Sequence, residues 1–133
     1  MDKRILEYFQ KDRFASENGI VLVECRPGYA VAEMSVTDRH LNAAGVVQGG
    51  ALFTLADLAF AAAVNAHGKT ALSITATVSF FQKKEGGKLT AVAKEISRNN
   101  RLSTAEVTVR DETHAIIISF MGTAYITQHP NLL

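Results

Sequence analysis

One long apolar run, residues 51–64, constrains what this chain can fold into more than any other feature. It follows Gly49-Gly50, and its only polar side chains are Thr54 and Asp57. A helix that is apolar on every side is normally buried, so the run predicts a central helix that the rest of the chain must cover on most sides. Asp57 would stand in the middle of that helix. An unpaired buried carboxylate costs several kcal/mol, and such a cost persists more often at working sites than in a plain core.

The segments on either side of this helix carry β-strand patterns. Two β-rich runs flank the turn signal Pro27-Gly28 and predict a hairpin over residues 20–36. After the helix, apolar and polar side chains alternate strictly from Ser73 to Phe80, which is the period of a strand. Three further β-rich runs are separated by short turn signals, and they cover residues 88–96, 102–110 and 115–126.

The order of these elements predicts the fold class. Short turns favour antiparallel neighbours, so we expect an α+β domain in which an antiparallel sheet of about six strands wraps around the one central helix. Ile5, Leu6 and Phe9 recur at helical spacing within residues 2–14 and predict a short amphipathic N-terminal helix. One sheet covers only part of an apolar helix. A second copy of the chain would hide the rest, so burial alone predicts a homodimer.

The composition argues against several classes of function. With 47% hydrophobic residues and a formal net charge of +1, the chain has no bulk electrostatic bias toward nucleic acid. Charged residues near its start exclude a secretory signal, and no stretch approaches the roughly 20 apolar residues of a membrane span. Cys25, the single cysteine, cannot form an internal disulfide, and the 4 histidines lack the spacing of metal ligands. We expect one cytoplasmic domain, residues 1–133, with no membrane or nucleic-acid partner.

The stretch HLNAAGVVQGGALFTLADLAFA, residues 40–61, resembles the motif of the hotdog-fold acyl-CoA thioesterases, in particular the phenylacetic-acid-pathway type. That motif has an Asn, a Gly-containing loop, His-Gly-Gly and an acidic residue well inside the helix, and the spacing of Asn42, Gly49 and Asp57 agrees. The resemblance implies a hotdog fold, an acyl- or aryl-acyl-CoA substrate, no cofactor or metal, and a homodimer that pairs into a dimer of dimers. One position departs, because the family commonly has His where this chain has Gln48.

The start of the central helix suits an oxyanion on physical grounds alone. A helix that begins near Gln48 presents unpaired N–H groups and the positive end of its dipole. One such N–H, from Gly49, placed about 3 Å from the oxyanion of a thioester can contribute roughly 10²–10³ in rate. Asp57 lies eight residues further on, about 12 Å along the helix axis, which is too far for both groups to touch one thioester. Two antiparallel central helices would bring Asp57 of one subunit near Gly49 of the other, so we predict two composite sites per dimer.

In this hypothesis Asp57 either takes a proton from the attacking water or attacks the carbonyl itself to form an anhydride. The resemblance implies that Asn42 holds the carboxylate or the water, and Ser73 is a weaker candidate for orienting that water. Gln48 can donate a hydrogen bond from its amide but cannot carry a proton. The candidates for contact with the substrate, some of them basic residues near strand ends that suit coenzyme A phosphates, are Gly50, His40, Lys83, Arg98 and Arg101.

Each of these residues also has a structural interpretation. Asp57 can be an interface carboxylate that is bonded to backbone groups or to Thr54. Asn42 can cap its own loop, Gly49-Gly50 can be a plain turn, and the basic residues can form an ordinary solvated rim. Two rival functions are a non-catalytic acyl-CoA-binding or sensing protein, and a hotdog hydratase or dehydratase. The latter would generally need a His paired with an acid.

Overall fold

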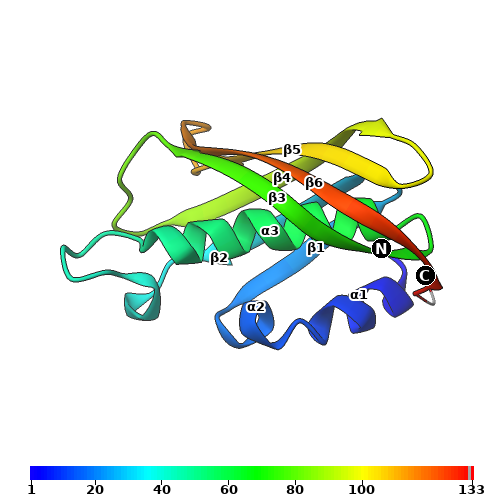
Figure 1. The fold of residues 1–133 in the computed structure, drawn as a ribbon. Helices are drawn as coiled ribbons and strands as arrows, with labels where there is room; N and C mark the ends of the chain where they lie inside the picture. Colours follow the sequence, from blue (N-terminus) through cyan, green and yellow to red (C-terminus); the bar gives the residue numbers. More distant parts are fainter. Residues whose placement is uncertain (132) are drawn as a thin grey trace.

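Six antiparallel strands form one sheet that curves around helix α3 (Gly49–Asn65) in the computed structural model, which describes residues 1–131 and 133 (Figure 1). The strand order is β1-β2-β4-β5-β6-β3. The predicted α+β architecture, a sheet wrapped around one central helix, is therefore confirmed. The strands are β1 (Ile20–Arg26), β2 (Tyr29–Ser35), β3 (Lys69–Phe80), β4 (Lys88–Arg98), β5 (Leu102–Arg110) and β6 (Ile116–Pro130).

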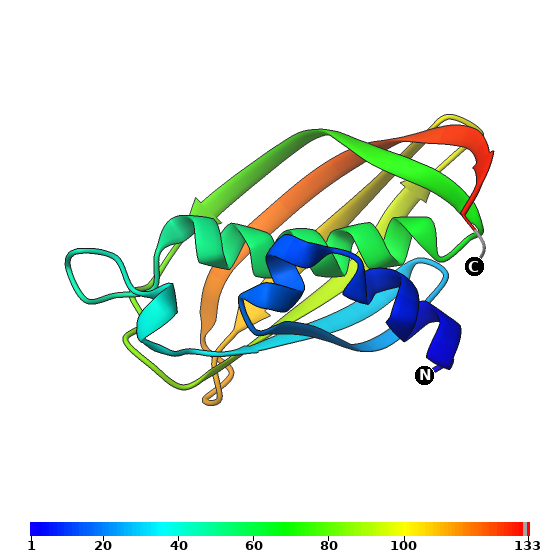
Figure 2. The same ribbon diagram turned by 90° about the horizontal axis from the view of Figure 1, so that it is seen from below.

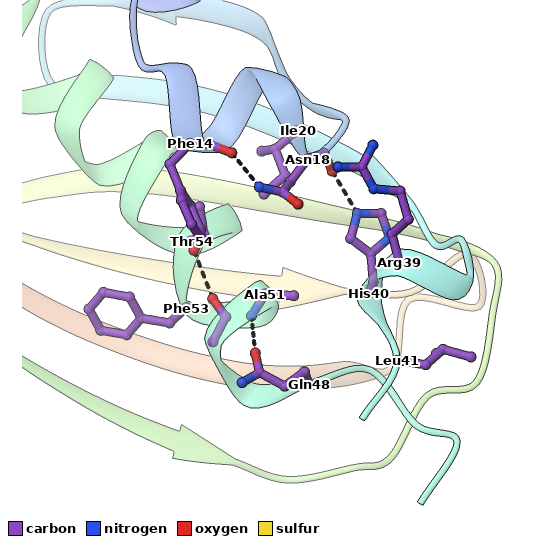
Figure 3. Close-up of a pocket in the computed structure, with 11 residues that line it drawn as sticks. Phe14, Asn18, Ile20, Arg39, His40, Leu41, Gln48, Ala51, Phe53 and Thr54 are labelled. Atoms are coloured by element: carbon purple, nitrogen blue, oxygen red, sulfur yellow. Dashed lines mark hydrogen bonds between the residues drawn. The ribbon is translucent and has the colours of Figure 1, made fainter. Parts of the chain in front are cut away.

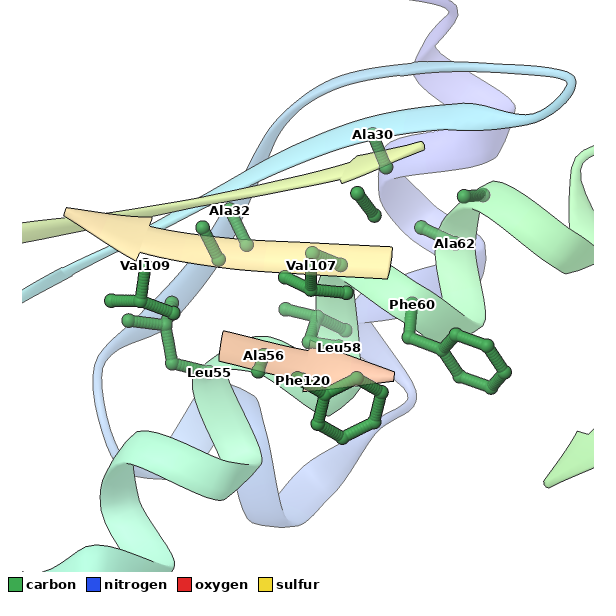
Figure 4. Packing of buried hydrophobic residues seen from close by; sticks show 14 of the residues in the cluster. Ala30, Ala32, Leu55, Ala56, Leu58, Phe60, Ala62, Val107, Val109 and Phe120 are labelled. Atoms are coloured by element: carbon green, nitrogen blue, oxygen red, sulfur yellow. The ribbon is translucent and has the colours of Figure 1, made fainter. Parts of the chain in front are cut away.

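Small side chains on the inner face of the sheet allow α3 to pack closely against it. The strands that face the helix carry fully buried alanines, which leave room for the larger side chains of α3, such as Leu55 and Phe60 (Figure 4). The Phe60 ring packs against Phe120 of β6 with a centroid distance of 5.5 Å. Large residues from the helix and small residues from the sheet thus fill one interior at close to crystal-like density. The alanines are Ala30, Ala32, Ala91, Ala93 and Ala105.

The sheet leaves one stripe of α3 uncovered. Most of the helix is buried. Beyond its first turn, the exposed or half-buried residues recur at helical spacing, and with Gly50 they form a stripe of Gly50, Phe53, Thr54, Asp57 and Ala61. The stripe lies on the open side of the sheet, where the N-terminal helices run beside α3 (Figure 2). No helix in the described part of the chain is long and apolar enough to cross a membrane.

The N-terminal segment forms two helices where the sequence predicted one. Helix α1 (Lys3–Gln10) has Lys11 as its C-cap, and α2 (Arg13–Glu17) begins after the N-cap residue Asp12. The break arises because the Asp12 side chain accepts a hydrogen bond from the Ala15 N–H at 3.1 Å and so caps a new helix.

Strand β3 lies at the edge of the sheet, away from its sequence neighbour β4. The short turn signal before β4 favoured antiparallel neighbours, but β3 pairs with β6, and β4 lies between β2 and β5. The connection, residues 81–87, is long enough to pass the start of α3, where the Val47 N–H donates to the Lys84 carbonyl at 2.7 Å. As a result β3 exposes a row of unpaired backbone groups together with large apolar side chains, among them Leu72, Ile74 and Phe80, which are 55–61% exposed.

The predicted strict alternation in β3 holds only in part. The register against β6 shifts between Ser73 and Thr75, so the side chains on the two sides of this bulge change faces. Ser73 pairs with the buried Ala124 and lies on the inner face, whereas Thr75 pairs with Thr123 on the outer face. After the bulge, Val78 pairs with the buried Phe120 on the inner face.

Replacing Gly122 with Ala tests how tightly the inner face is packed. A Cβ at this position would lie 2.8 Å from Phe120 Cε1 and 2.9 Å from Phe60 Cε1. We expect Gly122→Ala to lower the free energy of unfolding by about 1–3 kcal/mol, measured by urea denaturation at one fixed protein concentration. Gly86→Ala is the matched control, because no atom lies within 4 Å of its Cβ position, and it should change stability by less than about 0.5 kcal/mol. Equal effects of the two substitutions would contradict this account of the packing.

Candidate active site

The start of α3 leaves two backbone donors without a partner. Gln48 caps the helix, since its side-chain Oε1 accepts from the Ala51 N–H at 3.1 Å and its carbonyl accepts from Ala51 at 2.9 Å and Leu52 at 3.2 Å. Within the described chain, the N–H groups of Gly49 and Gly50 donate to no acceptor. They point out of the first turn of a 17-residue helix, whose dipole adds positive potential at this end. This end of α3 can therefore bind an anion or a developing oxyanion.

The absence of a side chain matters for a different reason at each of the two glycines. A Cβ at Gly50 would lie 2.6 Å from Gln48 Oε1, so a larger residue there would displace the cap. A Cβ at Gly49 would lie 3.5 Å from the ring of Phe80, which is an ordinary contact. The fold itself thus tolerates a side chain at Gly49, and the absence of one keeps its N–H open to a ligand.

A cavity of about 490 Å³ adjoins these donors. Its walls come from α2, the start of β1, the 3₁₀ turn η1 (Asp38–His40) and the first turns of α3 (Figure 3). Its lining is mixed. The apolar side chains are Phe14, Ile20, Leu41, Ala51 and Phe53, and the polar or charged ones are Asn18, Arg39, His40, Gln48 and Thr54. A cavity that combines apolar walls with polar groups at the start of a helix suits a ligand with a hydrocarbon or aryl body and a polar carbonyl.

His40 lies in the wall of this cavity and is locked by two hydrogen bonds. Its Nδ1 accepts from the Thr37 N–H at 3.0 Å, so the ring proton is on Nε2, which donates to the Asn18 carbonyl at 2.6 Å (Figure 3). His40 is only 4% exposed, although the sequence placed it among the candidates for contact with the substrate. Because its backbone carbonyl accepts from the Gln48 N–H at 2.7 Å, His40 joins the N-terminal helices to the start of α3.

Asp57 is half-buried on the open stripe of α3. Among the residues that the structure describes, no donor is hydrogen-bonded to its carboxylate, and Thr54 donates to the Gly50 carbonyl at 2.8 Å instead. Burial raises the pKa of Asp57 above its ordinary value, and the negative charge of Asp12 raises it further. A carboxyl group that lacks a partner and has a raised pKa suits proton transfer.

Asn42 and Ser73 lie outside this cavity. The Asn42 side chain is exposed and organises its own loop, because its Oδ1 accepts from the N–H groups of Ala44 at 2.9 Å and Val46 at 3.3 Å. Ser73 is exposed on the inner face of the edge strand β3. The single chain therefore does not gather Asn42, Ser73 and the start of α3 around one point.

The basic candidates separate into two groups at opposite ends of the molecule. Lys83 is exposed in the loop beside the start of α3, and its neighbour Lys84 is paired with Asp111 at 3.2 Å. Arg98 and Arg101 flank the turn between β4 and β5, at the far end of α3. Arg98 contacts that end directly, since its Nη1 donates to the Val64 carbonyl at 3.3 Å.

Sequence reasoning missed the apolar wall of the cavity. Phe14 does not share the helical spacing of Ile5, Leu6 and Phe9, and it lies on α2, where it is 68% exposed. Its position just after the cap residue Asp12 was the only available indication, because a large apolar side chain in the first turn of a short helix must contact something beyond that helix. Phe53 could not be told apart from core residues within a helix that is apolar throughout.

The structure contains no group of three or more His, Cys, Asp or Glu side chains arranged to hold a metal ion, among the residues described.

Comparison with known proteins identifies relatives along nearly the whole chain. A family model described as the thioesterase superfamily matches residues 44–118. A candidate esterase of Archaeoglobus fulgidus is 40% identical over 127 residues, which cover 94% of this chain and 82% of that protein. The acyl-coenzyme A thioesterase PaaI of Escherichia coli is 30% identical over 118 residues, covering 88% of this chain and 84% of that protein. The solved structure of E. coli PaaI has a TM-score of 0.89 at 28% identity, covering 93% of this chain and 91% of that chain.

This chain belongs to the thioesterase superfamily, because the family model matches more than half of it. Its sheet wrapped around one central helix is the hotdog fold, and both the sequence and the structure of PaaI align with it over most of their length. The resemblance carried by residues 40–61 is confirmed.

The raised pKa of Asp57 gives a direct test of the electrostatics at this site. In Asp12→Asn the side-chain oxygen that caps α2 is kept, but the like charge is removed, so we expect the pKa of Asp57 to fall toward its ordinary value. The pKa can be followed by a carboxyl ¹³C NMR titration, with the Asp57 signal assigned from its absence in Asp57→Asn. Glu106→Gln, which removes an exposed carboxylate on the outer face of the sheet, should leave this pKa unchanged. An unchanged value in Asp12→Asn would show that Asp12 does not act on Asp57.

Proposed function

We propose that this chain is an acyl-CoA thioesterase, which hydrolyses an acyl- or aryl-acyl-CoA to the free acid and coenzyme A. One observation carries the proposal: a cavity lined by Gly50 adjoins the first turn of α3, where the N–H groups of Gly49 and Gly50 have no acceptor within the described chain. The same helix carries Asp57, a half-buried carboxylate. Membership of the thioesterase superfamily supports the reaction, and the naming of the E. coli relative as an acyl-coenzyme A thioesterase supports the substrate class.

In the proposed reaction, the acyl group occupies the cavity and the thioester carbonyl faces the start of α3. As the carbonyl carbon becomes tetrahedral, its oxygen gains negative charge, and the Gly49 N–H donates to it. A donor fixed in this way needs no reorganisation during the reaction, which makes the hydrogen bond stronger in the transition state than in the ground state. The Gln48 cap holds the first turn in place and leaves its amide N–H₂ group free to donate as well.

Within one chain, Asp57 is about 12 Å from Gly49 along the axis of α3. The Asp57 carboxylate in the proposed site therefore comes from a partner subunit. The uncovered stripe of α3 and the exposed edge strand β3 support this arrangement, because both need cover. Phe53 lies midway between Gly49 and Asp57 in the sequence. If two α3 helices pack antiparallel and the two-fold axis passes at the level of Phe53, Asp57 of one helix lies at the same level as Gly49 of the other. Phe53 belongs to the uncovered stripe and is 37% exposed.

Two routes remain open for Asp57 in the composite site. As a general base it takes a proton from water, which then attacks the carbonyl carbon and releases the coenzyme A thiolate. As a nucleophile it forms a mixed anhydride that water then hydrolyses. In either route Ser73 and Asn42 are proposed to orient the carboxylate or the water, because both are exposed and thus accessible to a partner.

A second apolar surface supports a dimer of dimers. Leu102 and Leu72 both pair with Tyr125, so the three side chains form one row across β5, β6 and β3 on the outer face of the sheet. They are 39%, 60% and 47% exposed, respectively. Along β5 and β6 the next pair on this face is Thr104 with Thr123, whose hydroxyls are hydrogen-bonded, and the pair after it is Glu106 with Met121. The row is therefore an apolar surface bounded on this side by polar side chains, and it supports a second contact.

Replacing the proposed acid tests the function. We expect Asp57→Asn to keep the fold, because its size is preserved, and to lower kcat for the best substrate by at least about 10²-fold, because an amide is no base or nucleophile. The assay is thiol release from a panel of acyl- and aryl-acyl-CoA esters. Asp38→Asn, at the exposed start of η1, is the matched control and should retain wild-type activity.

Near-wild-type activity of folded Asp57→Asn would remove Asp57 from the mechanism. If the wild-type protein bound acyl-CoA esters but released no thiol from any of them, the protein would be a binding or sensing protein instead. The hydratase alternative has less support, because His40, which lines the cavity, uses both ring nitrogens within the fold.

A further inference from the structure

A second cavity, of about 400 Å³, lies at the far end of α3 from Gly49. It is formed where the connection after α3, the start of β3, the end of β6 and the turn between β4 and β5 meet. Polar and basic side chains supply nearly all of its lining, and they are His67, Lys69, Arg98, Asn99, Asn100 and Gln128.

Two of the side-chain amides in this cavity, those of Gln128 and Asn99, use their oxygens within the fold. Gln128 Oε1 accepts from Lys69 Nζ at 3.1 Å, and Asn99 Oδ1 accepts from the N–H groups of Arg101 and Leu102 at 2.9 Å each. Each of these two side chains therefore presents its amide nitrogen to a ligand, and the Asn100 amide lies beside them. Such a cavity favours a ligand rich in acceptor oxygens.

The charge of the cavity favours an anion. Glu95 lies beneath it and binds Arg98 Nη1 at 3.1 Å and His67 Nε2 at 2.9 Å, which fixes both side chains. Burial acts to raise the pKa of Glu95, but the hydrogen bonds from Ser103 and Arg98 outweigh it and lower that pKa. Glu95 therefore offsets one positive charge, while Lys69 has no carboxylate within ion-pair distance in the described chain. An excess of donors and of positive charge together fits a phosphate group.

The position of this cavity connects it with the start of α3 of another subunit. Within one chain the two are separated by the length of β3 from Lys69 to Phe80, roughly 36 Å at 3.3 Å per residue, which is farther than the pantetheine arm of coenzyme A extends. Phe80 contacts Gly49. If the exposed β3 edges of two subunits pair antiparallel, the Lys69 end of one strand approaches the Phe80 end of the other. The distance from the cavity of one subunit to Gly49 of its partner is then much shorter than the distance to Gly49 of its own chain.

We propose that the Lys69–Arg98 cavity binds phosphate groups of the coenzyme A nucleotide, and that it serves the thioester held at Gly49 of the partner subunit. This inference rests on the proposed function. Each subunit then contributes its helix start to one substrate and its phosphate cavity to the other.

The test compares Lys69→Gln with Lys94→Gln, which removes an exposed lysine from β4 outside the cavity. Two substrates with the same acyl group are used, the acyl-CoA and the acyl-N-acetylcysteamine thioester, which has no nucleotide. We expect Lys69→Gln to raise KM for the acyl-CoA by about tenfold, with kcat nearly unchanged, because one charge-assisted hydrogen bond is lost. Neither constant should change for the truncated substrate, and Lys94→Gln should match the wild type on both.

A binding measurement that needs no catalysis separates this proposal from the proposed function. We expect isothermal titration calorimetry to show that adenosine 3′,5′-bisphosphate binds the wild-type protein. Lys69→Gln should raise the Kd of this ligand about tenfold, like the KM for the acyl-CoA. If the bisphosphate binding depends on Lys69 but no thioester is hydrolysed, the cavity assignment stands and the proposed hydrolysis fails. No binding of the bisphosphate, or equal effects of Lys69→Gln and Lys94→Gln, would overturn the cavity assignment.

Discussion

Burial of the apolar helix α3 is the constraint on which the rest of this structure depends. A helix of 17 residues with almost no polar side chain is stable in water only when other elements cover it, and the six-stranded sheet does this with alanines that let the helix approach closely. The cover is incomplete, however. The stripe that contains Phe53 and Asp57 and the exposed edge of β3 both face outward. This incomplete burial supports the proposed second subunit, and it leaves the Asp57 carboxylate accessible to such a partner.

The start of α3 links this packing to chemistry. Its first turn is fixed from outside the helix, by the Gln48 cap and by the His40 carbonyl that accepts from the Gln48 N–H. These contacts satisfy the donor of Ala51 but not those of Gly49 and Gly50, so the helix presents two free N–H groups at a rigid position. A rigid donor is what oxyanion stabilisation requires. In the motif that this chain resembles, His commonly stands at the position of Gln48. Gln48 cannot carry a proton, but its side chain caps the helix.

The sequence predicted the features that depend on local pattern. The long apolar run of residues 51–64 predicted the central helix, and Pro27-Gly28 predicted the first hairpin. The spacing of Gly49 and Asp57 predicted groups too far apart for one thioester. Features that depend on contacts between distant segments were not predictable. The bulge after Ser73 follows from pairing with β6, and the edge position of β3 follows from how the connection passes α3. The cavity wall around Phe14 likewise depends on where α2 packs.

The most direct test of the central claim, a site shared between two subunits, is recovery of activity from two inactive variants. Asp57→Asn lacks the acid, and Gly49→Pro lacks the oxyanion donor; proline is tolerated at the first position of a helix, and Gln48 before it already has the extended conformation that proline requires. Refolded together, the variants form mixed dimers at about half of the total, each with one intact site, so the account predicts about a quarter of wild-type thioesterase activity. No recovery, with mixed dimers demonstrated by mass spectrometry, would contradict the shared site.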